Sequence, residues 1–264
     1  MKLGLVQMAM KPGMDENYHQ ALEFMDQTIG MDLLVFPRLQ LNPFFPRVHG
    51  LNADVALSRI NDTMLSSFAY QAKKRRTYLC PNVYLLQDEH KYNASLWFDK
   101  NGVMHKASYL VHVQDQRHFH EKEYFEPSPD GFIVHDTQYG KIGVVIGSDR
   151  HFPESVRTCA LQGAQLVVIP VANAMDEDIE LYEWELRSQA YENGIFIAMV
   201  NRCETEGRME FAGGSFVAGP DGSVIIQADN IPQIITCDID LKQVDAFRKR
   251  KDYLSMRRPE LYHE

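Results

Sequence analysis

The sequence contains few cysteines, and their spacing excludes several kinds of site. Its four cysteines stand far apart in a chain of 264 residues, at Cys80, Cys159, Cys203 and Cys237. No two of them form a C-x-x-C motif, which excludes a zinc ribbon and a thioredoxin-like site. Isolated cysteines in a chain of this length are typical of reduced, buried thiols. Cys80 and Cys237 lie in apolar runs and predict core positions, whereas Cys203 falls on a predicted loop that could be exposed.

Long apolar runs and an excess of basic charge are also missing. No segment approaches the roughly 18 consecutive apolar residues of a membrane-spanning helix. Residues 1–7 have no apolar stretch of signal-peptide length. The 27 basic and 36 acidic residues give a net charge of −9, which argues against a nucleic-acid partner or an anionic membrane surface. We therefore expect a cytoplasmic protein whose partners include neither nucleic acid nor membrane.

The remaining composition is that of a globular α/β protein. Hydrophobic residues make up 45% and charged residues 24% of the chain, which is long enough to bury a core without disulfides or a metal. Strand-like apolar runs at residues 33–36, 78–86 and 166–171 alternate with helical patterns at residues 18–29, 64–72 and 178–192. An Asn-Gly turn between residues 93–98 and 103–113 adds a hairpin. This order predicts mixed sheets with helices outside them, in a single domain over residues 1–264.

Two polar segments follow predicted buried strands. The first is residues 35–41, which includes Arg38, and the second is residues 144–154, which includes Gly147, Ser148 and Asp149. Ligands of open α/β sheets bind at the carboxyl ends of strands, so these segments are the first candidates for a site.

At these segments the chain resembles the nitrilase superfamily, the carbon–nitrogen hydrolases. The resemblance covers nearly the whole length and implies a four-layer α-β-β-α sandwich with mixed sheets. It also implies a homodimer or a higher homo-oligomer, and no cofactor. The matching blocks are residues 5–8, 34–37, 92–93, 121–125, 140–143, 149–154, 192–194, 201–202, 214–222 and 257–262.

The resemblance also implies a catalytic triad of cysteine, glutamate and lysine, and all three residues are replaced here. In such enzymes the thiolate attacks a carbonyl or nitrile carbon, the carboxylate moves the proton, and the ammonium stabilises the oxyanion. Arg38 stands at the glutamate position and Gly147 at the cysteine position. Counting back from the Glu121 block places Leu110 at the lysine position; Lys106, the nearest alternative, is four residues out of register. Glu121 matches a second glutamate that many members retain.

These replacements leave the role of Arg38 open between two interpretations. Arg38 could recognise a carboxylate or a phosphate, or it could form a salt bridge with Glu121 that fills the former pocket. We expect no catalytic residue. The candidate ligand-binding residues are Arg38, Glu121, Ser148, Asp149 and Asn173.

Three functions compete on this basis. The first is a pseudoenzyme that binds a small anionic ligand or a partner protein. The second is a carbon–nitrogen hydrolase acting on an amide, N-carbamoyl or nitrile substrate through a non-standard site around Glu121. The third is an architectural subunit that assembles with an active homologue.

Two further features of the sequence lead to expectations about metal binding and the dimer interface. His118 and His120 form an H-x-H pair, which is a weak metal signal by itself, and we expect no metal. Leu181, Trp184 and Tyr191 share a helical spacing on a segment that packs at the dimer interface in the family. The tail at residues 253–262 is expected to cross onto the partner subunit.

Overall fold

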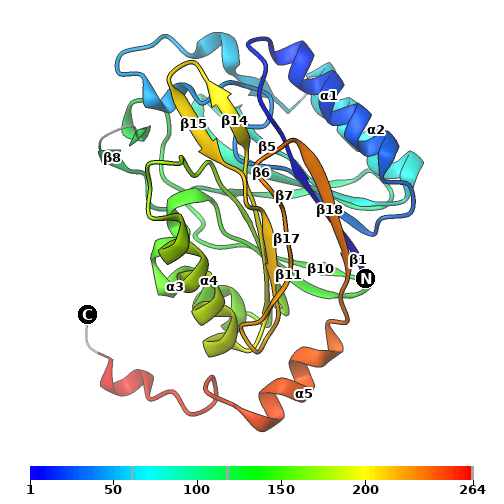
Figure 1. Ribbon diagram of the computed structural model, residues 1–264, viewed down its shortest axis with the longest axis vertical. Helices are drawn as coiled ribbons and strands as arrows, with labels where there is room; N and C mark the ends of the chain where they lie inside the picture. Colours follow the sequence, from blue (N-terminus) through cyan, green and yellow to red (C-terminus); the bar gives the residue numbers. More distant parts are fainter. Residues whose placement is uncertain (61, 117–118, 263–264) are drawn as a thin grey trace.

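Two facing sheets form the centre of the molecule. The computed structural model describes residues 1–60, 62–116 and 119–262 (Figure 1). The first sheet has the order β18-β1-β2-β4-β6-β5-β3, with β7 paired to β6, and the second has the order β10-β11-β12-β13-β16-β17. The first comprises β1 Lys2–Gln7, β2 Leu33–Val35, β3 Ser58–Arg59, β4 Tyr78–Cys80, β5 Asn82–Gln87, β6 His90–Phe98, β7 Met104–Tyr109 and β18 Gln233–Asp238. The second comprises β10 Val134–Thr137, β11 Gly140–Val144, β12 Leu166–Pro170, β13 Phe196–Val200, β16 Phe216–Ala218 and β17 Val224–Gln227.

Helices cover the outer face of each sheet. Helices α1 (Met14–Gln27) and α2 (Thr63–Arg75) pack on the first sheet, and α3 (Pro153–Leu161) and α4 (Ile179–Asn193) pack on the second (Figure 1). Strand residues alternate between the two sides: in β12, Leu166 and Val168 join the core between the sheets, whereas Val167 and Ile169 face the helices. The predicted four-layer α-β-β-α sandwich with mixed sheets is confirmed.

The predicted strand at residues 78–86 is in fact two strands. β4 ends at Cys80 and β5 begins at Asn82, with Pro81 between them. Proline has no N–H to donate to a ladder, so it separates the two pairings. β4 lies parallel to β2, whereas β5 pairs with β6 in an antiparallel hairpin.

A hairpin that the sequence pattern did not predict follows β13. Strands β14 (Cys203–Glu206) and β15 (Met209–Ala212) pair with each other outside both main sheets. Cys203 is fully buried there, so the expectation that it could be exposed is wrong. Burial raises the pKa of the thiols of Cys80, Cys159 and Cys203 to about 12, which makes a reactive thiolate unavailable at these positions.

The described part of the chain has no helix with the length and apolar character needed to cross a membrane. Two short hairpin strands, β8 (Asp115–Gln116) and β9 (Phe119–His120), and helix α5 (Lys242–Arg250) complete the fold.

Exposed apolar side chains gather on α4 and on the tail after α5. Leu181 and Trp184 on α4 are 63% and 55% exposed, and Met256 in the tail is 72% exposed. The tail runs away from the sheets beyond α5 (Figure 1), and it contacts α4 where Tyr253 packs against Tyr191. Large apolar groups on an outer helix are typical of a protein interface, and the homodimer stays a prediction.

We therefore predict that the intact chain has the mass of a dimer or a larger assembly at micromolar concentration, measured by light scattering after gel filtration. Leu181→Glu combined with Trp184→Glu should lower that mass, because charged groups would replace the apolar contacts. Tyr70→Glu is the matched control: Tyr70 is 61% exposed, on α2 at the opposite side of the sandwich, and its change should leave the mass unaltered. A wild-type chain with the mass of a monomer would contradict the homodimer.

Candidate functional site

The two sheets bring Arg38 and Gly147 into contact. Arg38 follows β2, and Gly147 begins the short helix η4 (Gly147–His151) after β11. A Cβ atom built on Gly147 would lie only 2.9 Å from Arg38 Nη1 and 3.1 Å from its Cζ. Such a contact is closer than real Cβ atoms make, so the guanidinium of Arg38 fills the space that a side chain at position 147 would need.

Arg38 forms a buried ion pair with Glu121. Arg38 Nη1 donates to Glu121 Oε1 at 2.5 Å, and the two side chains are 2% and 0% exposed. The second carboxylate oxygen accepts the N–H of Gln114 at 3.2 Å. Arg38 Nε donates to Asn93 Oδ1 at 2.7 Å. Of the two interpretations that the sequence left open, the salt bridge is therefore the one that the structure contains.

Neighbouring groups hold this pair in place. Asn93 is oriented by Asn82, whose Oδ1 accepts from Asn93 Nδ2 at 2.7 Å. Arg202 Nη2 donates to the backbone oxygen of Arg38 at 2.6 Å, while Arg202 itself pairs with Glu206 at 2.6 Å. The rings of Phe44 and Phe125 lie 5.6 and 5.7 Å from Arg38 Cζ, a distance that favours cation–π attraction.

The lysine position supplies no cation. Leu110 is fully buried in the core between the sheets, and its N–H donates to the backbone oxygen of Asn93 at 3.0 Å. Lys106, the alternative in sequence, is more than half exposed and pairs with Asp130 at 2.9 Å. The one cation that contacts Glu121 in the described structure is thus Arg38.

Ser148 and Asp149 fix the loop that carries Gly147. Ser148 Oγ donates to the backbone oxygen of His112 at 2.8 Å. Asp149 accepts the N–H groups of Val111 and His112 at 3.0 and 2.7 Å. Asp149 therefore has a structural role, whereas Ser148 also borders a cavity.

A cavity of about 190 Å³ adjoins Arg38. Its described lining contains two guanidinium groups, Arg38 and Arg150, and one carboxylate, Glu177. Arg38 Nη2 and Arg150 Nε have no hydrogen-bond partner among the described residues, although both are buried. Burial lowers the pKa of Arg150, and the nearby Glu177 and Glu185 act in the opposite direction. The described lining residues are Arg38, Gln114, Gln116, Phe119, Gly147, Ser148, Arg150, His151, Ala172, Asn173, Glu177 and Tyr182.

Three of the five candidate ligand-binding residues, Arg38, Ser148 and Asn173, line the cavity. Glu121 and Asp149 are not among its described lining residues, although Glu121 pairs with Arg38. The sequence pattern did not single out Arg150, which also lines the cavity. Arg150 Nη1 donates to the backbone oxygen of Gly147 at 2.8 Å.

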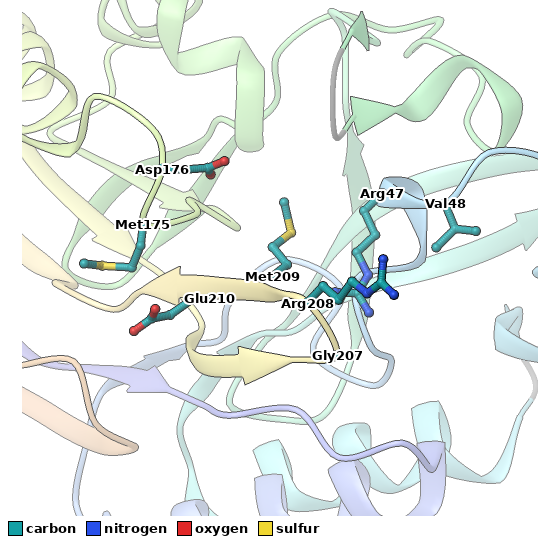
Figure 2. Close-up of a pocket in the computed structure, with 8 residues that line it drawn as sticks. All are labelled: Arg47, Val48, Met175, Asp176, Gly207, Arg208, Met209 and Glu210. Carbon is teal, nitrogen blue, oxygen red and sulfur yellow. The ribbon is translucent and has the colours of Figure 1, made fainter.

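A larger cleft of about 550 Å³ lies between the β14–β15 hairpin and the segments around residues 47 and 175. Figure 2 shows Arg47 and Arg208 on one side of it and Met175 and Glu210 on the other. The described lining of this cleft contains none of the three positions that the resemblance assigns to the triad, whereas the smaller cavity is lined by two of them, Arg38 and Gly147. The sequence pattern did not indicate this cleft because it did not predict the hairpin.

The histidine pair is only partly described. His118 lies outside the described residues, and His120 ends β9, 3.6 Å from Asp115 Oδ1.

Comparisons with known proteins agree with the resemblance of the sequence. A family model described as carbon-nitrogen hydrolase matches residues 2–249. The chain is 30% identical over 239 residues to a protein of Pseudomonas protegens named as a hydrolase in the pqqF 5′ region, covering 88% of this chain and 80% of that one. A crystal structure of a carbon-nitrogen hydrolase from Helicobacter pylori G27 matches with a TM-score of 0.94 at 24% identity, covering 99% and 97% of the two chains.

An amidase from Nesterenkonia sp. AN1 is also similar, with a TM-score of 0.84 at 26% identity over 99% of this chain and 95% of that one. That structure is of a mutant described with the acetamide moiety of fluoroacetamide added covalently to its active site cysteine.

The buried ion pair leads to a prediction about stability. Glu121→Gln should lower the free energy of unfolding by roughly 3–5 kcal/mol, because it leaves the buried Arg38 without a counter-charge. The free energy of unfolding is measured by chemical denaturation, followed with two independent signals. Asp130→Asn, which breaks the exposed Lys106–Asp130 pair, is the control and should cost no more than about 1 kcal/mol.

A double replacement tests whether the loss of stability comes from the unpaired charge of Arg38. Arg38→Met with Glu121→Leu removes both charges and keeps apolar volume, so it should cost much less than Glu121→Gln alone. A Glu121→Gln protein as stable as the wild type would show that Arg38 does not depend on this carboxylate.

Proposed function

The chain belongs to the carbon–nitrogen hydrolase family, and we propose that it is a member without amidase activity that binds a small anion in the cavity beside Arg38. The observation that carries the first part is the position of the Arg38 guanidinium. It fills the space next to Gly147 where the family's thiol would stand, 2.9 Å from the Cβ position.

Loss of the three family residues removes three different contributions to catalysis. Gly147 provides no nucleophile, Arg38 cannot accept a proton, and Leu110 provides no charge for an oxyanion. Catalytic groups that act as a unit lose their effect together, so restoring one of them is not expected to restore the rate.

The alternative of a hydrolase built around Glu121 has less support. A general base must be within reach of a substrate proton and free to accept it. Glu121 is fully buried, with Oε1 bound to Arg38 and Oε2 bound to the N–H of Gln114. Both oxygens of this carboxylate are therefore occupied by hydrogen bonds within the site.

The cavity supports binding of a small anion. The unpartnered Nη2 of Arg38 and Nε of Arg150 are buried donors, and buried donors are normally satisfied by a partner or by water. Guanidinium groups bind carboxylate and phosphate oxygens well. At about 190 Å³ the cavity is smaller than the roughly 300–1,000 Å³ typical of sites for drug-sized ligands, which favours a ligand of few atoms.

We predict that the protein releases no ammonia from acetamide or from an N-carbamoyl amine. Gly147→Cys alone should also remain inactive, because the new side chain meets Arg38 and finds neither base nor ammonium. The measurement is ammonia release, with an active amidase of the family assayed in parallel. Turnover by the wild type on the order of 1 per second or faster, in the range of ordinary enzymes, would refute this part of the proposal.

The second prediction concerns the anion. Acetate or phosphate, compared with chloride at equal ionic strength, should raise the melting temperature of the wild type because a ligand of the folded state stabilises it by mass action. A chain of this size gains about 2–4 °C for each kcal/mol. Arg38→Met combined with Glu121→Leu should abolish the rise, measured against that variant's own melting temperature.

Arg208→Met is the matched control for the anion test. Arg208 is exposed and lines the larger cleft, so its loss should leave the rise unchanged. An equal rise in the wild type and in the double variant would place anion binding elsewhere and overturn the proposed site.

A further inference from the structure

Three side chains with metal-binding atoms come together beside the ion pair. Among the residues that the structure describes, His49, His120 and Glu123 form a group whose potential ligand atoms all lie within 4.8 Å of one another. They come from different segments: His49 follows η1 (Phe45–Arg47), His120 ends β9, and Glu123 ends η3 (Glu121–Glu123). No local sequence motif links His49 to the other two.

The contacts within this group are already close. His49 Nδ1 contacts Glu123 Oε1, and the two imidazole rings have centroids 5.6 Å apart. The N–H of Gly50 donates to the other carboxylate oxygen, Glu123 Oε2, at 2.7 Å. That hydrogen bond orients the carboxylate as outer groups orient the ligands of metal sites.

The three side chains would need to move only a little to bind an ion. Zinc binds imidazole nitrogen and carboxylate oxygen at about 2.0–2.2 Å, so two of its ligand atoms lie no more than roughly 4.4 Å apart. The described atoms are within 4.8 Å, and His49 is 81% exposed, which leaves its ring free to rotate toward the others. Two imidazoles and a carboxylate are a donor set that zinc and neighbouring transition metals accept.

We propose that His49, His120 and Glu123 bind one divalent transition-metal ion of the zinc class. The three ligands leave at least one coordination position to water. Asp115 Oδ1 lies 3.6 Å from His120 Nδ1, but Asp115 is not part of the group of mutually close ligand atoms.

Binding would connect the loop after η1 to the segment that carries Glu121. Glu121 lies between His120 and Glu123 in the chain and holds Arg38. The β8–β9 hairpin contributes Gln116 and Phe119 to the wall of the 190 Å³ cavity. A bound ion would therefore fix one wall of that cavity from the outside, which implies a structural or regulatory role for the metal.

The test is titration of the intact, untagged and metal-free protein with Zn²⁺ by calorimetry. We expect one ion per chain, together with a higher melting temperature in the presence of Zn²⁺. His49→Ala and His120→Ala should each weaken binding by more than the roughly 10–100-fold that loss of an outer-shell partner costs. Co²⁺ provides a second measurement, because its absorption spectrum reports directly on nitrogen and oxygen ligation.

His90→Ala is the matched control. His90 is also an exposed histidine paired with a glutamate, Glu126 at 2.8 Å, but it does not belong to a described group of three. Its loss should leave the Zn²⁺ affinity unchanged. The proposal is overturned if Zn²⁺ does not bind, or if it binds the His49→Ala and His120→Ala proteins as tightly as the wild type. These outcomes are independent of the amidase and anion tests, which involve Arg38 and the cavity.

Discussion

A buried guanidinium needs a counter-charge and space, and both needs shape the centre of this protein. Arg38 receives the counter-charge from Glu121 at 2.5 Å and the space from Gly147, which has no side chain to meet it. The residues at positions 38 and 147 are therefore physically linked. A side chain at position 147 would collide with the guanidinium of Arg38. Arg38 and Glu121 together sum to zero charge, so neither buried charge is left uncompensated.

The rest of the site is organised around that pair. Arg202, itself paired with Glu206, binds the backbone oxygens of Arg38 and Leu39 at 2.6 and 2.9 Å and so fixes the turn from which Arg38 extends. Asn93 and Asn82 continue the polar network into the first sheet. Two nitrogen atoms of this network, Arg38 Nη2 and Arg202 Nε, have no hydrogen-bond partner among the described residues. Arg150 Nε, outside the network, is likewise unpartnered, and Arg150 lines the same cavity as Arg38.

Local patterns of alternating apolar strands and helical spacing predicted mixed sheets with helices outside them. The four layers, and the assignment of Arg38, Leu110 and Gly147 to the family's triad positions, came from the resemblance, whose blocks stand in a fixed order. The sequence could not decide whether Arg38 pairs with Glu121, since 83 residues separate them and only the fold brings them together. The β14–β15 hairpin was missed for a related reason. Glu206 is buried against Arg202, so an acidic residue occupies a position where the strand pattern expects an apolar one. The group of His49, His120 and Glu123 likewise depends on a contact between distant segments.

The two roles considered for Arg38 are not mutually exclusive in the folded chain. A guanidinium has five N–H donors in a planar fork, and the contacts to Asn93 and Glu121 engage Nε and Nη1. Nη2 remains without a described partner, on a residue that also borders the cavity. The carboxylate of Glu121 thus makes it possible to bury the arginine, and Nη2 keeps hydrogen-bonding capacity that neither contact uses. The salt bridge and the proposed anion site therefore involve different nitrogen atoms of one side chain.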